Sequence, residues 1–228
     1  PDWITTKKIK KVGGSVNYVV CNSAATLVYL ANQACITPHI WLSRIDKLNY
    51  PDRMIFDLDP SGKDFEDVRK AALNLKDFLQ ELGLIPFVMT TGSRGLHVVV
   101  PLKRTDDFDT VHQFARDVAT FMANNDPDHL TVEVRKDKRR GRVFVDYLRN
   151  AFGQTGVAPY AVRALPGAPV AAPITWDEVE NKTLTPQKYT IKNISKQIKK
   201  KGDPWKGITR SAKTLKDARK RLDTLIGQ

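Results

Sequence analysis

The sequence is poor in cysteine and has no long apolar run. Its 228 residues include only two cysteines, Cys21 and Cys35, which are too few for a disulfide framework and are not spaced as a zinc-ligand pair. No stretch of about 18 apolar residues occurs, so we expect no membrane-spanning helix and no membrane partner. The low cysteine content is typical of a protein of the reducing cytoplasm.

Several catalytic signatures are also missing. The chain contains no G-x-x-x-x-G-K-[ST] loop, which argues against a Walker-type nucleotide site. It has no nucleophile elbow and no zinc-ligand spacing, so acyl transfer and zinc-dependent hydrolysis are poorly supported. Because 41% of the residues are hydrophobic, the composition is that of a folded protein rather than a disordered one.

Positive charge is abundant but concentrated at one end of the chain. The formal net charge is +12. Residues 186–228 contain 13 Lys and Arg but only three Asp, a net charge of +10, so the rest of the chain is close to neutral. Such a segment attracts polyanions through counterion release, but a solvated helix face that is kept soluble by its charge would have the same composition.

The periodicity of the apolar residues predicts an α+β fold built on antiparallel sheet. Strands are expected at residues 16–20, 54–58, 85–90, 96–101, 131–135 and 142–147. The third and fourth of these form one predicted hairpin, and the fifth and sixth form another around a basic turn. Helices are expected from a cap at 22 or 23 to about 34, and over 64–82, 108–123 and 211–226. We predict one catalytic domain over 1–205 and a basic amphipathic helix or tail over 206–228.

The sharpest local motif is a pair of aspartates at the end of an apolar strand. In Phe56-Asp57-Leu58-Asp59-Pro60, side chains alternate along the strand, so Asp57 and Asp59 project from one face while Phe56 and Leu58 enter the core. Two carboxylates about 7 Å apart on one face repel each other unless a cation lies between them. Mg²⁺ or Mn²⁺ is the natural cation, although two aspartates that merely cap the next helix remain an alternative.

A third acidic residue, Asp146, ends another apolar strand in Arg142-Val143-Phe144-Val145-Asp146. A second aspartate at a strand end could complete a carboxylate cluster that binds two metal ions. The sequence does not show whether the two strands are neighbours.

The loop between the strands of the first hairpin has the features of a phosphate-binding loop. In Thr90-Thr91-Gly92-Ser93-Arg94-Gly95-Leu96-His97 the glycines allow close approach of the backbone, the hydroxyls and N–H groups are donors, and Arg94 provides a guanidinium fork. His97 lies on the outgoing strand and faces away from the side chain of Leu96. An ordinary hairpin turn with an incidental arginine is the alternative.

Taken in order, these segments resemble a known family. D-L-D-P-S-G, T-T-G-S-R-G-L-H-V, R-V-F-V-D-Y and V-A-P-Y-A-V-R are similar to the motifs of the polymerase domain of bacterial ligase D, in the archaeo-eukaryotic primase superfamily. The resemblance extends from about Trp3 to Trp205. It implies antiparallel sheets flanked by helices around a central catalytic cleft.

The resemblance implies a template-directed nucleotidyltransferase that extends a primer in DNA double-strand break repair by non-homologous end joining. Asp57, Asp59 and Asp146 correspond to the family's metal-binding carboxylates, which bind two Mn²⁺ or Mg²⁺ ions. One ion activates the primer 3′-hydroxyl and the other neutralises the triphosphate. A preference for ribonucleotides is expected with it.

The resemblance also assigns nucleotide-binding residues. The expected contacts to the nucleoside triphosphate come from His39, Thr91, Ser93, Arg94, His97, Arg139, Asn150 and Arg163. Two of them depart from the family, which commonly has Lys at Arg94 and Ser at Thr91. Arg149 also replaces a usual Gln. Arginine forms bidentate contacts that lysine does not, so the phosphate contact itself differs here.

The remaining expectations concern DNA and partners. Lys199, Lys200, Lys201 and Lys206 of the basic segment are expected to contact DNA ends or gapped duplex DNA. The family's aromatic pair for base stacking and its lysines for a 5′-phosphate would precede Pro1. The expected partners are a separate DNA ligase and an end-binding protein of the Ku type, in the cytoplasm of a bacterium or archaeon.

Two other functions fit part of the sequence. A metal-dependent phosphohydrolase also begins with D-x-D at a strand end, but Ser61 stands where such enzymes need Thr or Val, and Asp106-Asp107 follow a loop rather than a strand. A non-catalytic nucleic-acid-binding domain would use the basic segment. It would leave three strand-end aspartates unexplained, because bare carboxylates repel phosphate.

Overall fold

The computed structural model describes residues 1–11, 13–62 and 64–227. The strands in chain order are β1 (Thr6–Lys11), β2 (Gly14–Val19), β3 (His39–Trp41), β4 (Arg53–Asp59), β5 (Phe87–Thr90), β6 (Leu96–Pro101), β7 (Leu130–Thr131), β8 (Val143–Asp146), β9 (Thr155–Val157) and β10 (Pro173–Ile174). The helices are α1 (Ala24–Asn32), α2 (Phe65–Glu81), α3 (Phe108–Asn125), α4 (Trp176–Glu180), α5 (Ile194–Lys201) and α6 (Lys216–Ile226).

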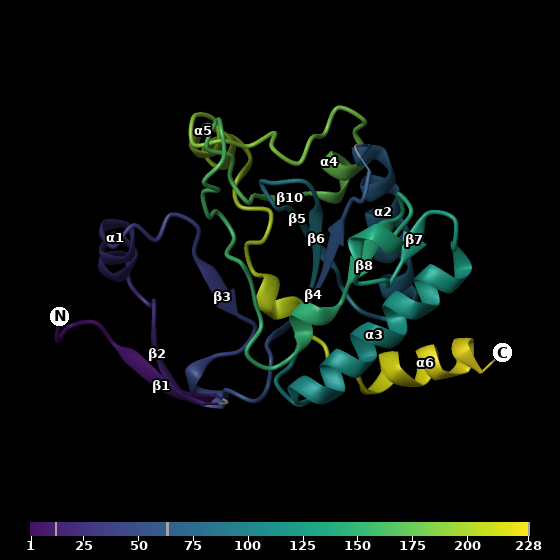
Figure 1. Ribbon diagram of the computed structural model, residues 1–228, viewed down its shortest axis with the longest axis horizontal. Coiled ribbons are helices and arrows are strands. Elements are labelled where there is room, and N and C mark those ends of the chain that lie inside the picture. The colour runs from purple at the N-terminus through teal and green to yellow at the C-terminus, as the bar shows by residue number, and fades with distance from the viewer. Residues whose placement is uncertain (12, 63, 228) are drawn as a thin grey trace.

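A six-stranded sheet forms the centre of the molecule, with the strand order β10-β5-β6-β4-β8-β7 (Figure 1). All neighbouring strands are antiparallel except β7 and β8, which are parallel. The predicted α+β class is confirmed, and so is the hairpin of β5 and β6. Strand β4 lies between β6 and β8, so its side chains have neighbours on both sides.

One face of the sheet packs against α2 and α3. Met54, Phe56 and Leu58 of β4 are fully buried there with the apolar faces of both helices. The helices form as the apolar spacing predicts, and each begins at an aspartate whose carboxylate accepts a backbone N–H of the first turn: Asp64 for α2 and Asp107 for α3. This face is the main hydrophobic core.

The opposite face changes character along the strands. Near the start of β4 it is apolar, because Ile55 packs with Val99 of β6 and with Trp205, whose indole N–H donates to the carbonyl of Val88. Further along β4, the same face presents Asp57 and Asp59 instead. The alternation within β4 therefore leaves a polar area on this side of the sheet.

Two small ribbons accompany the central sheet, and one of them, β3 with β9, borders that polar area. β3 pairs antiparallel with β9, and β1 pairs antiparallel with β2. Figure 1 shows β1, β2 and α1 to the side of the main body, with β3 between them and the central sheet. Helix α1 begins after Ser23, whose hydroxyl accepts the N–H of Thr26, as its predicted cap requires.

The second predicted hairpin is wrong. Of the expected strand 131–135 only Thr131 is in a strand, and that strand, β7 (Leu130–Thr131), runs parallel to β8. The carbonyl oxygens of Glu133 and Val134, which a longer strand would use for pairing, instead accept the guanidinium of Arg139 at 2.9 and 2.8 Å. A buried arginine thus takes the place of a strand partner.

The C-terminal helix is shorter than predicted. It begins at Lys216 instead of residue 211, because the backbone of Lys213 bonds to the end of β6 at Pro101 and Lys103. Its apolar face packs in the main core, where Leu215, Ala218 and Leu222 are buried. Gln228, the last residue of the predicted basic tail, lies outside the described residues. None of the described helices is both long and apolar enough to cross a membrane.

Helix α6 is expected to contribute to the stability of the whole domain. Leu222 is fully buried, whereas Ile226 on the same helix is 51% exposed. Leu222→Ala should lower the free energy of unfolding by about 2–5 kcal/mol, through lost burial and a cavity. The control Ile226→Ala should change it by less than about 0.5 kcal/mol. Thermal or urea unfolding followed by circular dichroism measures both, and equal stabilities of the two variants would contradict the packing of α6.

Candidate active site

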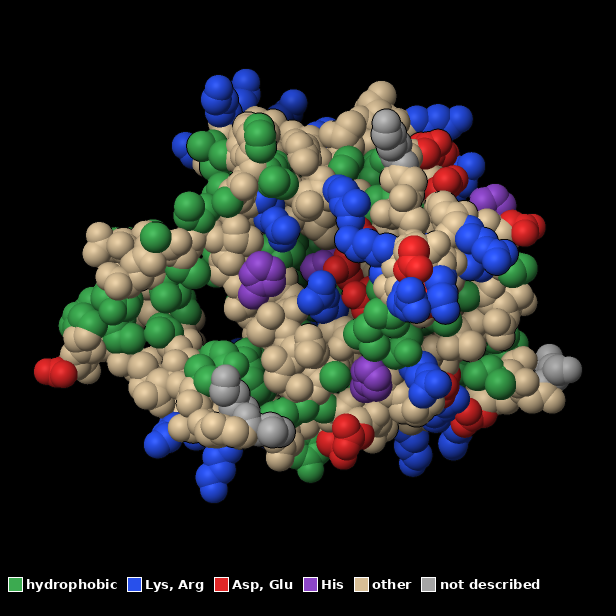
Figure 2. Space-filling view, in the orientation of Figure 1, with side chains coloured by type: hydrophobic (Ala, Val, Ile, Leu, Met, Phe, Trp, Pro, Cys, Tyr) green, Lys and Arg blue, Asp and Glu red, His purple; other side chains and the backbone are tan. Residues whose placement is uncertain are grey.

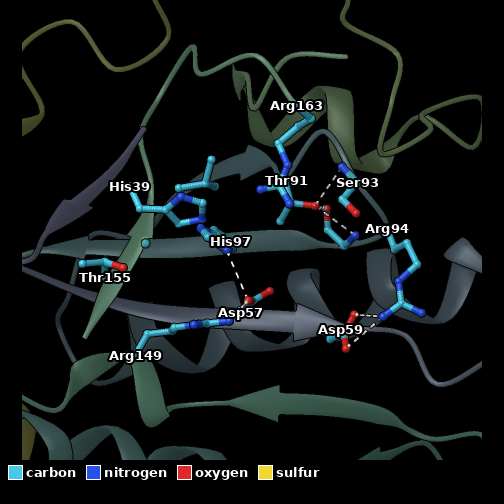
Figure 3. A pocket seen from close by; sticks show the side chains of 13 residues that line it. His39, Asp57, Asp59, Thr91, Ser93, Arg94, His97, Arg149, Thr155 and Arg163 are labelled. Atoms are coloured by element: carbon cyan, nitrogen blue, oxygen red, sulfur yellow. Dashed lines mark hydrogen bonds and ion pairs between the residues drawn. The ribbon is translucent and has the colours of Figure 1, made fainter. Parts of the chain in front are cut away.

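A polar cavity of about 190 Å³ opens on the side of the sheet opposite α2 and α3. Figure 2 shows acidic, basic and histidine side chains gathered in a hollow near the middle of this face, and Figure 3 shows the cavity from close by. It is lined by His39, Asp57, Asp59, Thr91, Ser93, Arg94, Gly95, His97, Arg149, Thr155, Gly156, Val157 and Arg163. Most of the residues predicted from the sequence therefore lie together.

Asp57 lies at the floor of the cavity between two polar neighbours. Its register partner on β6 is His97, and its register partner on β8 is Asp146. Nε2 of the buried His97 lies 3.4 Å from the Asp57 carboxylate. Burial acts to raise the pKa of Asp57, but His97, Arg149 and Arg163 act in the opposite direction and hold that pKa below its usual value. Asp57 is therefore an anion at neutral pH.

Asp146 stands directly across from Asp57 on the neighbouring strand. Burial is the largest cause that raises the pKa of Asp146, and the negative charge of Asp57 raises it further. The backbone N–H of Leu148, which donates to the Asp146 carboxylate at 2.8 Å, acts in the opposite direction and lowers that pKa. Directly opposed residues on adjacent strands have Cβ atoms only about 5 Å apart, so two carboxylates in this position destabilise each other. The pair concentrates negative charge that nearby cations must offset.

Arg149 is the cation closest to both members of this pair. Its Nη2 lies 3.7 Å from the Asp57 carboxylate and its Nε lies 3.9 Å from the Asp146 carboxylate. The short 3-10 helix Leu148–Asn150 follows β8 and turns the chain so that Arg149 comes back over the strand end. These separations are those of ion pairs rather than of direct hydrogen bonds.

Asp59 faces the same side as Asp57 but is engaged by two arginines. Nη2 of Arg94 lies 3.0 Å from one carboxylate oxygen, and Nη1 of Arg139 lies 3.4 Å from the other. Arg94 is 57% exposed and Arg139 only 5%. Arg94 is thus a solvated partner that can move away, whereas Arg139 is held by its contacts to two backbone carbonyls and by the ring of Phe144.

The loop between β5 and β6 is closed by one hydroxyl. The Thr91 hydroxyl donates to the carbonyl of Gly95 at 3.0 Å and accepts the N–H groups of Ser93 and Gly95. Gly92 has φ of +64°, and a Cβ at Gly95 would lie 2.1 Å from the carbonyl oxygen of Leu58. Both glycines are therefore required, the first for its left-handed backbone and the second for its contact with the end of β4.

In Figure 3, His39 and Arg163 lie across the cavity from Asp57 and Asp59. Nδ1 of His39 lies 3.0 Å from the carbonyl oxygen of Thr37. Because a carbonyl only accepts, this nitrogen carries the hydrogen and Nε2 is left as an acceptor in the neutral ring. Arg163 packs against the loop at Gly92, where a Cβ would lie 2.8 Å from its Cγ. His39 comes from β3, the strand before β4 in the chain, and Arg163 comes from the segment that follows β9.

Two predicted nucleotide-binding residues lie outside the cavity lining. Asn150 is fully buried, and its amide pairs with both the N–H and the carbonyl of Ile55, at 2.8 and 2.7 Å. It therefore fixes the position of β4 instead of facing the cavity. Arg139 is likewise buried behind Asp59. Sequence position alone did not reveal that these polar side chains had partners inside the protein.

The structure also adds residues that the sequence analysis did not assign to the site. Arg149 was noted only as a replacement for Gln, although its position three residues after Asp146 on a tight helical turn is a usable signal. Thr155 lines the cavity because β9 pairs with β3. Nothing in the local sequence indicates that long-range pairing.

The carboxylates of the site are candidate ligands for a divalent metal ion. Within the described ranges, no group of three or more His, Cys, Asp or Glu side chains is arranged to bind one as it stands. Asp57 and Asp146 nevertheless occupy paired positions on neighbouring strands, and carboxylate oxygens are the ligands that Mg²⁺ and Mn²⁺ require. Substrate phosphates usually complete the shell of such an ion, so the pair fits a site that is finished by the substrate.

Comparison with known proteins gives consistent relatives. The chain is 32% identical over 194 residues to the bifunctional non-homologous end joining protein LigD of Bacillus subtilis, and the match covers 84% of this chain and 31% of that protein. It is 33% identical over 189 residues to the multifunctional non-homologous end joining protein LigD of Pseudomonas aeruginosa, covering 80% and 22%. The chain thus spans less than a third of the length of these two relatives.

The fold agrees with a solved structure. The polymerase domain from Mycobacterium tuberculosis ligase D in complex with DNA matches with a TM-score of 0.82 and 28% identity, over 93% of this chain and 76% of that one. A family model described as the LigD primase-polymerase domain matches residues 1–205. The protein therefore belongs to the family of LigD primase-polymerase domains.

Proposed function

We propose that this protein is a template-directed nucleotidyltransferase that extends DNA primers with nucleoside triphosphates, with a preference for ribonucleotides, in the repair of double-strand breaks by end joining. Membership of the LigD primase-polymerase family supports this class of activity, and the relatives from Bacillus subtilis and Pseudomonas aeruginosa are named as non-homologous end joining proteins. Membership of this family also argues against the phosphohydrolase and the non-catalytic alternatives.

The observation that carries the proposal is the register of β4 and β8. Asp57 and Asp146 are paired directly, and only Arg149 is close enough to both to offset their charge among the described residues. A purely structural role would not need two carboxylates opposed on neighbouring strands, because mutual repulsion destabilises the fold. Asp57 lines the cavity, and Asp146 lies beside it on β8, outside the cavity lining. Like charges that are held together at the cost of fold stability, with perturbed pKa values, are typical of a functional site.

The proposed cofactor is a pair of Mn²⁺ or Mg²⁺ ions bound by Asp57 and Asp146, with Asp59 as a further ligand once Arg94 releases it. When bound, such ions lower the pKa of the attacking hydroxyl and neutralise the triphosphate. Nε2 of His97 keeps the Asp57 carboxylate in position, and the backbone N–H of Leu148 does the same for Asp146. Both carboxylates are then preorganised before the substrate arrives.

The other side of the cavity is suited to the triphosphate. Arg94 and Arg163 supply guanidinium groups, and Ser93 supplies a hydroxyl from a loop that the Thr91 hydroxyl keeps closed. Nε2 of His39 adds a nitrogen that donates to phosphate oxygens when the ring is protonated. In this scheme Arg94 exchanges Asp59 for a phosphate, which frees the Oδ1 of Asp59 for a cation while Arg139 stays near Oδ2.

The basic end of the chain is proposed to bind DNA. Lys199, Lys200 and Lys201 form the last turn of α5, and no ion pair among the described residues involves them. Lys206 follows Trp205 and is exposed. The structural relative from Mycobacterium tuberculosis is described in complex with DNA, which supports a DNA substrate here. A DNA ligase and a Ku-type end-binding protein are the proposed partners.

Replacing either opposed aspartate is expected to abolish primer extension. Asp57→Asn and Asp146→Asn each remove one metal ligand without changing the size of the side chain. Extension of a gapped primer–template with Mn²⁺ should fall at least about 100-fold, the upper range for losing even an outer partner of a metal site. DNA affinity should be equal or higher, because a negative charge is removed. The exposed Asp128→Asn serves as the control and should be as active as the wild type.

Normal primer extension by both Asp57→Asn and Asp146→Asn, equal to that of the control Asp128→Asn, would show that the metal-binding assignment is wrong. Supplying each ribonucleoside and deoxyribonucleoside triphosphate separately to the wild-type protein tests the ribonucleotide preference in the same assay.

The lysines of α5 are expected to contribute to DNA affinity through charge alone. The triple variant Lys199→Gln, Lys200→Gln and Lys201→Gln should weaken binding about equally for all DNA sequences. It should also reduce the slope of log affinity against log salt by about 2–3, close to 0.9 for each lost phosphate contact. Fluorescence anisotropy across a salt series measures both quantities.

A control with the same loss of charge separates local contacts from net charge. Lys70→Gln, Lys182→Gln and Lys216→Gln lie on three different elements or loops and remove three charges as well. An equal change in slope for the two triple variants would show that α5 is not a DNA contact.

A further inference from the structure

Arg149 is the cation that the structure places beside both Asp57 and Asp146. Its guanidinium lies 3.7 Å from the carboxylate of Asp57 and 3.9 Å from that of Asp146. Figure 3 shows the side chain extending along the cavity toward Asp57. Of the basic side chains that the structure describes, it alone lies at ion-pair distance from both, since His97 contacts only Asp57.

The side chain of Arg149 is not locked in this position. It is 41% exposed, and both of its contacts are too long to be direct hydrogen bonds. Arg139, which pairs with Asp59, is only 5% exposed and donates to two backbone carbonyls. Arg149 is therefore held to its carboxylates by charge alone, as an exchangeable cation would be.

The backbone at Arg149 is fixed even though its side chain is exposed. The amide of the next residue, Asn150, is fully buried and pairs with the N–H and the carbonyl of Ile55 on β4. On the other side, the N–H of Leu148 donates to the Asp146 carboxylate. The guanidinium can thus leave the two carboxylates by rotation of side-chain torsions, without any change in β4 or β8.

A divalent ion and the guanidinium compete for the same carboxylates. Mg²⁺ lies only about 2.1 Å from its oxygen ligands, so an ion shared by Asp57 and Asp146 would lie close to the guanidinium of Arg149. Positive charges at such short range repel strongly in a partly buried site. The measured metal affinity is then the intrinsic affinity reduced to the fraction of molecules from which Arg149 has moved away.

We propose that Arg149 is a built-in counter-cation that competes with the divalent ion for Asp57 and Asp146 and thereby sets the metal affinity of the site. The proposal rests on the proposed function, because it takes the opposed carboxylates as the metal site. In the metal-free protein the guanidinium offsets their repulsion, and on metal binding it moves to the exposed edge of the cavity. A residue that only positioned the carboxylates would act in the opposite direction, because its loss would weaken metal binding.

The test measures Mn²⁺ binding to the full chain by electron paramagnetic resonance, with Mn²⁺ alone as the probe. Leaving out the nucleotide removes any contact between Arg149 and phosphate from the measurement. Arg149→Gln removes the charge and keeps a polar side chain. It should bind Mn²⁺ at least about 10-fold more tightly than the wild type, as expected when the binding-competent arrangement is populated at about 10% or less.

Three further variants show whether the gain comes from the charge beside the two carboxylates. Arg149→Lys keeps the charge and should bind Mn²⁺ more weakly than Arg149→Gln. Asp146→Asn, added to Arg149→Gln, should remove the gain, which places the bound ion at the two carboxylates. Arg116→Gln is the matched control and should leave the Mn²⁺ affinity unchanged, because Arg116 is exposed on α3, on the opposite side of the sheet.

Thermal unfolding gives a second readout that does not depend on a bound metal. In EDTA, Arg149→Gln should have a lower Tm than the wild type, because the two carboxylates then repel each other without a counter-charge. Adding Asp146→Asn should restore the Tm. Mn²⁺ should raise the Tm of Arg149→Gln more than that of the wild type, because a ligand that binds more tightly stabilises the folded state more.

The outcomes separate this proposal from the proposed function. Mn²⁺ binding by Arg149→Gln that is equal to or weaker than that of the wild type overturns the competition and leaves the metal site in place. The competition is also overturned if Arg149→Lys binds as tightly as Arg149→Gln, or if the gain survives Asp146→Asn. Absence of Mn²⁺ binding in every variant overturns both the competition and the proposed metal site. A protein that shows the gain but extends no primer keeps the competition and loses only the polymerase activity.

Discussion

The opposition of Asp57 and Asp146 across the centre of the sheet is the constraint on which the rest of the site depends. β4 carries Asp57 between His97 on one side and Asp146 on the other, so a histidine and a second carboxylate meet the same side chain from neighbouring strands. Burial is the main cause that raises the pKa of Asp146, and repulsion from Asp57 adds to it. Nearby positive groups hold the pKa of Asp57 low. Such a pair is stable only when cations surround it, and the arginines of the cavity provide that charge.

Part of this arrangement follows from the sequence of β4 and β6. Phe56 and Leu58 face the helices, so Asp57 and Asp59 point to the other face of the sheet. The same alternation in β6 makes His97 point to the face opposite to that of Val98. The shared face of Asp57 and Asp59 could therefore be predicted from the sequence, whereas the pairing of β4 with β8, which brings Asp146 opposite Asp57, could not. The β5–β6 hairpin follows from its short loop, and α2 and α3 follow from their spacing and their aspartate caps.

What could not be predicted depends on contacts between distant segments. Arg139 takes the carbonyl oxygens of Glu133 and Val134, which prevents the second hairpin, and no local pattern indicates that a basic residue in a turn will be buried. The β3–β9 pair brings Thr155 to the cavity from more than a hundred residues away. Asn150 looked like a ligand contact from its motif, but its amide is used to fix Ile55. The excess positive charge also divides by role: Arg219 and Arg221 of α6 contact Asp117 and the end of α2, whereas the lysines of α5 are exposed.

The central claim is that the opposed carboxylates form a cation site, and Mn²⁺ binding measured by electron paramagnetic resonance tests it without any catalytic step. Wild-type protein with a non-hydrolysable nucleoside triphosphate should bind Mn²⁺ more tightly than the nucleotide does alone. Asp146→Asn should weaken that binding by at least about 10-fold, as expected when a metal site loses an oxygen ligand. Equal Mn²⁺ affinity in the wild type and in Asp146→Asn would contradict the account.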